Sequence, residues 1–107
     1  MRKFDTSKLL ITPFFIELIF VTFLMACVYI IYSRRLDKYY IGSSSQSPEE
    51  RLQKHLLHHR GFTGRAKDWE LVYRELYNTK SDAYRRERLL KAWKSRKQIE
   101  ELIKGGY

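Results

Sequence analysis

Residues 27–42 of the chain read CVYIIYSRRLDKYYIG. Two runs rich in β-branched and aromatic residues, Cys27–Tyr32 and Tyr39–Gly42, flank a polar connection of six residues, Ser33–Lys38. Runs of this composition are typical of strands, and a connection of this length suits an antiparallel hairpin. The stretch therefore predicts two paired strands, with Gly42 allowing a close backbone approach at the end of the second one.

A helix signal follows the hairpin. Ser47 is placed to cap the helix, Pro48 occupies its first position, and Glu50 completes a capping box. These residues predict a helix that runs to about His58. The segment that follows, His59–Lys67, is basic and contains glycines, so we expect a loop there. We expect His58 and His59, at the end of the helix, to be helix-terminal residues rather than metal ligands.

Three more elements are expected in the second half of the chain. Trp69–Tyr77 is rich in strand-forming residues and predicts a third strand. Ser81 is expected to cap a helix that runs to about Trp93, and Ser95 to open a last helix that ends at Gly105-Gly106. The order β-β-α-β-α-α predicts an α+β domain with a small three-stranded antiparallel sheet flanked by helices.

The charge of the chain indicates a polyanionic partner. The 107 residues include 21 Lys and Arg against 12 Asp and Glu, a net charge of +9 with a pI near 9.8. Residues 25–107 hold 18 basic and 10 acidic side chains, a net charge of +8, so this part of the chain carries most of the excess. Nucleic acid or an anionic membrane surface fits such a balance. The single Cys27 excludes an intramolecular disulfide and a Cys-rich zinc module.

The first 25 residues have a different character. Leu9–Ile31 is nearly continuous in apolar residues, and its length matches the roughly 20 residues that cross a bilayer, although Glu17 interrupts it. Three interpretations stay open: a membrane anchor limited to residues 9–26, a lipoprotein cleavage box that would place a lipid on Cys27, or an extension upstream of a true start at Met25. We therefore divide the chain into a hydrophobic extension, residues 1–25, and a domain, residues 26–104. We expect it in the cytoplasm, or at a membrane if the anchor is real.

Residues along the domain resemble the signature of the GIY-YIG nuclease family, namely Val28-Tyr29, Tyr40-Ile41-Gly42, Arg51-Leu52, His55 and Glu87. The run Trp93–Lys97 and the element order resemble the short stand-alone bacterial members, which are related to the N-terminal nuclease domain of the excinuclease that makes the incisions in bacterial nucleotide excision repair. The resemblance covers residues 26–104. It departs from the family at Cys27, where a glycine is usual, and at Ile99, where some members carry an asparagine.

The resemblance implies an endonuclease that hydrolyses DNA phosphodiesters with Mg²⁺ or Mn²⁺ in repair or recombination. Glu87 would hold the metal. It shares one stripe of its expected helix with Ala83 and Leu90, which places a lone carboxylate at the edge of the core. Without a metal, the same position would suit an ion pair with Arg51 or another arginine.

The other expected site residues lie in the first half of the domain. Arg51 and His55 are spaced i, i+4, so they project from one helix face, and the resemblance implies that Arg51 stabilises the scissile phosphate. His55 is expected to hydrogen-bond a tyrosine or to share in proton transfer, or else to pack beside leucines. Tyr29 and Tyr40 are expected close together on adjacent strands, with Tyr29 helping to activate the water.

Basic residues outside this set are expected to bind DNA phosphates, which gives salt-dependent affinity with little sequence information. They are Arg60, Arg65, Lys67 and Arg86. The charge suits equally well a non-catalytic nucleic-acid-binding module on the same fold, which could be membrane-anchored. No second DNA-binding domain is evident, so specificity would come from DNA shape or from a protein partner.

Overall fold

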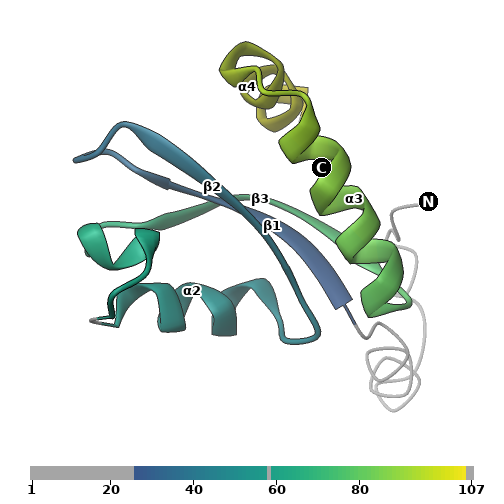
Figure 1. Ribbon diagram of the computed structural model, residues 1–107, viewed down its shortest axis with the longest axis horizontal. Coiled ribbons are helices and arrows are strands. Elements are labelled where there is room, and N and C mark those ends of the chain that lie inside the picture. The colour runs from purple at the N-terminus through teal and green to yellow at the C-terminus, as the bar shows by residue number, and fades with distance from the viewer. Residues whose placement is uncertain (1–25, 58, 106–107) are drawn as a thin grey trace, which may run out of the picture.

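The computed structural model describes residues 26–57 and 59–105. The elements in chain order are β1 (Ala26–Ser33), β2 (Lys38–Ser44), α2 (Pro48–Leu56), the short 3₁₀ helix η2 (Phe62–Arg65), β3 (Glu70–Tyr77), α3 (Lys80–Ala92) and α4 (Arg96–Gly105) (Figure 1). The interpretations of residues 1–25 as an anchor or an upstream extension lie outside the described residues. Within the described residues, no helix combines the length and the apolar character needed to cross a membrane.

The sheet is antiparallel throughout, and β1 is its central strand, in the order β2-β1-β3. Both neighbours of β1 cover its edges and helices cover its faces, so its side chains are almost completely buried. This explains why Cys27–Tyr32 is apolar without alternation. The α+β fold with a three-stranded antiparallel sheet is as the sequence predicts.

Helices cover both faces of the sheet, with α2 on one side and α3 and α4 on the other (Figure 1). Tyr29 and Ile31 of β1 belong to the core under α2, and Val28 and Ile30 belong to the core under α3 and α4. Successive strand residues face opposite sides, so one strand supplies both cores. Ile99 of α4 is a buried residue of the second core.

The helix boundaries differ slightly from the sequence prediction. Ser47 caps α2 as expected, because its hydroxyl accepts the Glu50 N–H at 3.1 Å, but α2 ends at Leu56 rather than near His58. The prediction that Ser81 caps α3 is wrong. Thr79 is the cap, since its hydroxyl accepts the Asp82 N–H at 3.1 Å, and the helix therefore begins two residues earlier.

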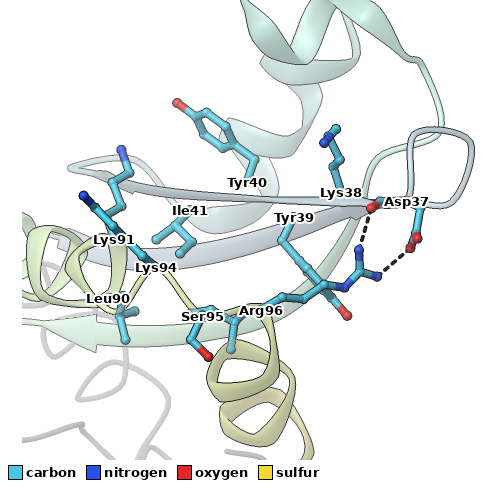
Figure 2. Close-up of a pocket in the computed structure, with 11 residues that line it drawn as sticks. Asp37, Lys38, Tyr39, Tyr40, Ile41, Leu90, Lys91, Lys94, Ser95 and Arg96 are labelled. Carbon is cyan, nitrogen blue, oxygen red and sulfur yellow. Dashed lines mark hydrogen bonds and ion pairs between the residues drawn. The ribbon is translucent and has the colours of Figure 1, made fainter.

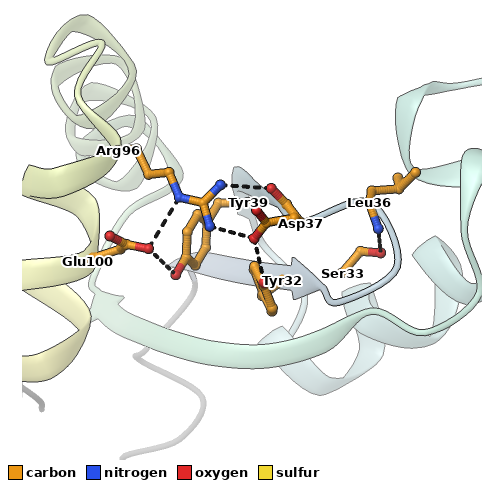
Figure 3. Close-up of polar contacts among 7 residues, drawn as sticks. All are labelled: Tyr32, Ser33, Leu36, Asp37, Tyr39, Arg96 and Glu100. Atoms are coloured by element: carbon orange, nitrogen blue, oxygen red, sulfur yellow. Dashed lines mark hydrogen bonds and ion pairs between the residues drawn. The ribbon is translucent and has the colours of Figure 1, made fainter.

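The turn between β1 and β2 is fastened to α4 by a network of polar side chains (Figure 3). The Arg96 guanidinium donates to both the main-chain carbonyl and the carboxylate of Asp37, and also to Glu100. Tyr32 donates to Asp37 at 2.6 Å, and Tyr39 donates to Glu100 at 3.2 Å. These contacts therefore join the end of the hairpin to α4.

The side chain of Cys27 is buried in β1, and its Sγ donates to the main-chain oxygen of Gln46 at 3.2 Å. Burial raises the pKa of this thiol to about 11. A lipid on this sulfur is incompatible with the buried position of Cys27, which counts against the lipoprotein interpretation.

Candidate active site

The hairpin brings the two signature tyrosines onto the sheet face that α2 covers. Tyr29 is almost fully buried, and its ring centroid lies 6.5 Å from that of Tyr40. Tyr29 is directly opposite Gly42 in the β1–β2 register, and a Cβ on Gly42 would overlap the Tyr29 hydroxyl. The expected close approach at Gly42 is therefore an approach of the tyrosine ring to the backbone.

Helix α2 places two further expected residues beside these tyrosines. His55 is buried, and its Nε2 lies 2.8 Å from the Tyr29 hydroxyl oxygen, with the imidazole 4.9 Å from the Tyr40 ring centroid. Arg51, one turn earlier on the same face, is half-buried, and its Nε has no hydrogen-bond partner. Leu52 and Leu56 also pack into this core, so His55 has both of the environments that the sequence suggested.

Burial and charge set the protonation of these groups. Burial lowers the pKa of His55 to about 4, and the charge on Arg51 adds to this effect. His55 is therefore neutral near pH 7. Burial raises the pKa of the Tyr29 hydroxyl, although the neighbouring Arg51 guanidinium opposes the rise. Any ionised form of Tyr29 would depend on nearby cations and hydrogen-bond donors.

A cavity of about 300 Å³ opens beside these side chains. Tyr40, Arg51, Lys54 and His55 line it. The unpaired Nε of Arg51 and the second cation, Lys54, suit an anionic group with acceptor oxygens, such as a phosphate.

Glu87 lies on α3, on the opposite face of the sheet. Gly42 faces α2, so the next residue of the edge strand, Ser43, faces α3, and its hydroxyl donates to Glu87 at 2.6 Å. Lys91, one turn along α3, donates to the other Glu87 oxygen at 2.7 Å. Glu87 therefore pairs with a lysine rather than with Arg51 or another arginine.

Lys91 lies between Glu87 and Tyr40 at the edge of β2. Its Nζ lies 5.9 Å from the Tyr40 ring centroid. Figure 2 shows Lys91 and Tyr40 extending from α3 and β2 to the same side of a shallow groove between the two elements. The edge strand therefore lies between two groups of the expected site residues, with Tyr29, Arg51 and His55 on one face and Glu87 on the other.

Comparison with protein-family models gives a match to the GIY-YIG catalytic domain over residues 25–100. The chain belongs to the GIY-YIG family. Comparison with curated proteins and with solved structures gave no significant match. GIY-YIG domains are generally nucleases that act on DNA and typically use divalent metals.

Glu87 could hold a divalent metal ion only if water molecules and the phosphate of the substrate supplied the other ligands. Among residues 26–57 and 59–105, no group of three or more His, Cys, Asp or Glu side chains is placed to hold a metal ion. Mg²⁺ needs few protein ligands, since it keeps most of its waters and takes one or two carboxylates together with phosphate oxygens. The single carboxylate of Glu87 is consistent with that ligand set.

Three of the four basic residues expected to bind DNA lie on the surface near η2. Arg60, Arg65 and Lys67 are exposed, and the Arg65 guanidinium lies 5.4 Å from the Phe62 ring centroid. Arg86 lies elsewhere. Its guanidinium donates to Glu75 of β3 at 3.0 Å, so we do not include Arg86 among the phosphate contacts.

Sequence reasoning missed two residues next to this site. The Thr63 hydroxyl is buried and lies 2.8 Å from His55 Nδ1 and 2.8 Å from His59 Nε2. His59 follows the end of α2 in a loop, so helical spacing does not relate it to His55, and nothing in the sequence around Thr63 distinguishes it. Their grouping depends on how the loop folds back over α2.

Proposed function

We propose that this GIY-YIG domain is a metal-dependent endonuclease that hydrolyses phosphodiester bonds in DNA and takes part in repair or recombination. The observation that carries the proposal is the grouping of Tyr40, Arg51 and His55 around one cavity, with the Tyr29 hydroxyl 2.8 Å from His55 Nε2 and Glu87 just across the edge strand. These residue types match the needs of phosphodiester hydrolysis, which are water activation, charge stabilisation and departure of an oxygen.

The scissile phosphate is best accommodated where the cavity and the groove meet. Tyr40 borders both the cavity lined by Arg51 and a groove of about 440 Å³ on the far side of β2. Lys38, Lys91 and Lys94 line that groove (Figure 2). Cations on both sides of Tyr40 support a DNA backbone that crosses the edge of β2 at this tyrosine.

In this proposal each side chain has a separate task. Arg51 binds the phosphate and cannot lose its charge near neutral pH. Tyr29 orients the attacking water, with the Arg51 cation and His55 beside its hydroxyl. Glu87 would hold the metal, which supplies charge neutralisation at the phosphate and the leaving oxygen. To act in this way, Glu87 must give up its contact with Lys91, which is then available to the phosphate.

The test is DNA cleavage by the full chain and by Glu87→Gln, with Mg²⁺, Mn²⁺ or EDTA. We expect cutting of plasmid, single-stranded or branched DNA by the wild type, loss of cutting in EDTA, and loss in Glu87→Gln. The thermal unfolding midpoint should change little, because Glu87 makes one partly exposed ion pair.

Glu101→Gln is the matched control, since Glu101 is an exposed carboxylate on α4 and its loss should leave cleavage unchanged. Full activity in Glu87→Gln would contradict the proposal. DNA binding without any cleavage, in a folded wild type, would favour the binding module on the same fold.

A further inference from the structure

A chain of hydrogen bonds links the loop after α2 to the Tyr29 hydroxyl. The Gly61 N–H donates to His59 Nδ1 at 3.0 Å, and His59 Nε2 lies 2.8 Å from the Thr63 hydroxyl. That hydroxyl lies 2.8 Å from His55 Nδ1, and His55 Nε2 lies 2.8 Å from the Tyr29 hydroxyl. The side chains that form these hydrogen bonds are buried, except for the half-buried His59.

The main chain fixes the direction of the first two bonds. A backbone N–H can only donate, so His59 Nδ1 must be the acceptor and carry no proton. A neutral imidazole has one proton, which is then on Nε2. His59 therefore donates to the Thr63 hydroxyl oxygen.

The direction of the remaining bonds follows from the Thr63 hydroxyl. Its oxygen already accepts from His59, and its own proton needs an acceptor because the residue is buried. His55 Nδ1 is the neighbouring atom that can accept it, provided that this nitrogen is bare. The proton of neutral His55 is then on Nε2, so His55 donates to Tyr29 rather than accepting from it.

The loop that carries Thr63 and His59 is held by its own contacts. The Trp69 indole N–H donates to the Thr63 carbonyl at 2.8 Å, and the Gly64 N–H donates to the Gly61 carbonyl at 3.0 Å. Gly64 packs against the backbone of His59 so closely that a Cβ would overlap the His59 carbonyl. The donor and acceptor positions are therefore set before DNA binds.

We propose that Thr63 and His59 are positioning residues that hold His55 as the Nε2–H tautomer, so that His55 donates to Tyr29 and the Tyr29 proton is directed away from His55. In this arrangement the Tyr29 oxygen accepts a hydrogen bond from His55 and lies near Arg51, and both stabilise a phenolate. The catalytic part of this inference rests on the proposed nuclease function, whereas the tautomer does not.

The direct test is the protonation of the His55 ring nitrogens in the full chain at neutral pH. Long-range ¹H–¹⁵N correlation spectra of histidine-labelled protein distinguish bare from protonated nitrogens, and His55→Gln and His59→Gln assign the signals. We expect a bare Nδ1 and a protonated Nε2 in both His55 and His59. A proton on His55 Nδ1 would overturn the inference.

Two pairs of variants test the positioning role. Thr63→Val removes the hydroxyl and keeps the shape, so His55 should become a mixture of tautomers and kcat should fall by at least about tenfold with KM unchanged. Thr63→Ser keeps the hydroxyl, so it should show the single His55 tautomer and the kcat of the wild type. His59→Leu should resemble Thr63→Val, while His59→Gln can still donate to Thr63 and should resemble the wild type.

The outcomes separate this inference from the proposed function. A wild type that cuts no DNA but shows the expected tautomer would contradict the nuclease and leave the positioning of His55 in place. An unchanged tautomer and an unchanged kcat in Thr63→Val would overturn the inference. If Thr63→Val does not fold, the comparison of His59→Leu with His59→Gln decides, because His59 is only half-buried.

Discussion

The position of the Tyr29 ring depends on a residue that has no side chain. Tyr29 and Gly42 are paired across β1 and β2, and the tyrosine hydroxyl occupies the space that a Gly42 side chain would need. His55 approaches the same hydroxyl from α2. The final glycine of the signature therefore acts on the site through the space that it leaves.

We predict that Gly42→Ala moves the Tyr29 ring and weakens its hydrogen bond to His55. Overpacking of this kind typically costs about 1–3 kcal/mol of unfolding free energy, and cleavage should fall to a small fraction of the wild-type rate. Urea denaturation and the cleavage assay measure the two effects. Gly105→Ala is the control, because nothing lies within 4 Å of a Cβ there. Equal behaviour of the two variants would refute the steric argument.

At the scale of elements, α3 is held against the sheet by a buried ion pair. Glu75 of β3 is almost fully buried and accepts hydrogen bonds from Tyr73, Tyr77 and Arg86. Burial opposes the ionisation of Glu75, but these donors outweigh burial and lower its pKa. Since Arg86 precedes Glu87, the ion pair also helps to fix the part of α3 that carries the expected metal ligand.

We predict that Arg86→Ala lowers the free energy of unfolding by about 3 kcal/mol, because it leaves a buried carboxylate without its cation. The lower end of the usual range applies, since the Arg86 side chain is 24% exposed. Arg85→Ala is the matched control, because the Arg85 side chain is 79% exposed and should contribute less than about 0.5 kcal/mol. Similar urea midpoints for the two variants would show that the ion pair is dispensable.

At the scale of the whole molecule, the net charge of +9 concerns binding rather than folding. Cations border the edge of β2 on both faces, with Arg51 and Lys54 in the cavity and Lys91 and Lys94 in the groove. Arg60, Arg65 and Lys67 are exposed on the segment around η2, beyond the cavity. This distribution suits a DNA backbone more than a compact ligand.

We predict that neutralising Arg60, Arg65 and Lys67 together, each to Gln, makes DNA binding less dependent on salt. Each lost phosphate contact reduces the slope of log K against log salt by about 0.9, so the triple variant should lose about 2–3. The control replaces three exposed lysines on α3 and α4, Lys80, Lys97 and Lys104, by Gln, which gives the same net charge. Equal slopes for both triples would mean that total charge, not this surface, governs binding.

The amino-acid sequence by itself determined the features that depend on near neighbours in the chain. Composition predicts the strands, Ser47 and Glu50 predict the start of α2, and the i, i+4 spacing places Arg51 and His55 on one helix face. The stripe of Ala83, Glu87 and Leu90 likewise follows from helical periodicity, and the structure buries both apolar members. Such signals are readable because their hydrogen bonds and periodicities are local.

Only the tertiary structure decided which distant residues meet. The strand order makes β2 an edge, so Glu87 can reach Ser43 while Tyr29 lies on the opposite face. The fold pairs Arg86 with Glu75 and places Thr63 between His55 and His59. These contacts depend on loop geometry, strand order and packing between segments that are far apart in the sequence. The local pattern of one segment therefore does not predict which residue of the other segment it will contact. Local chemistry fixed the elements, and long-range packing fixed the site.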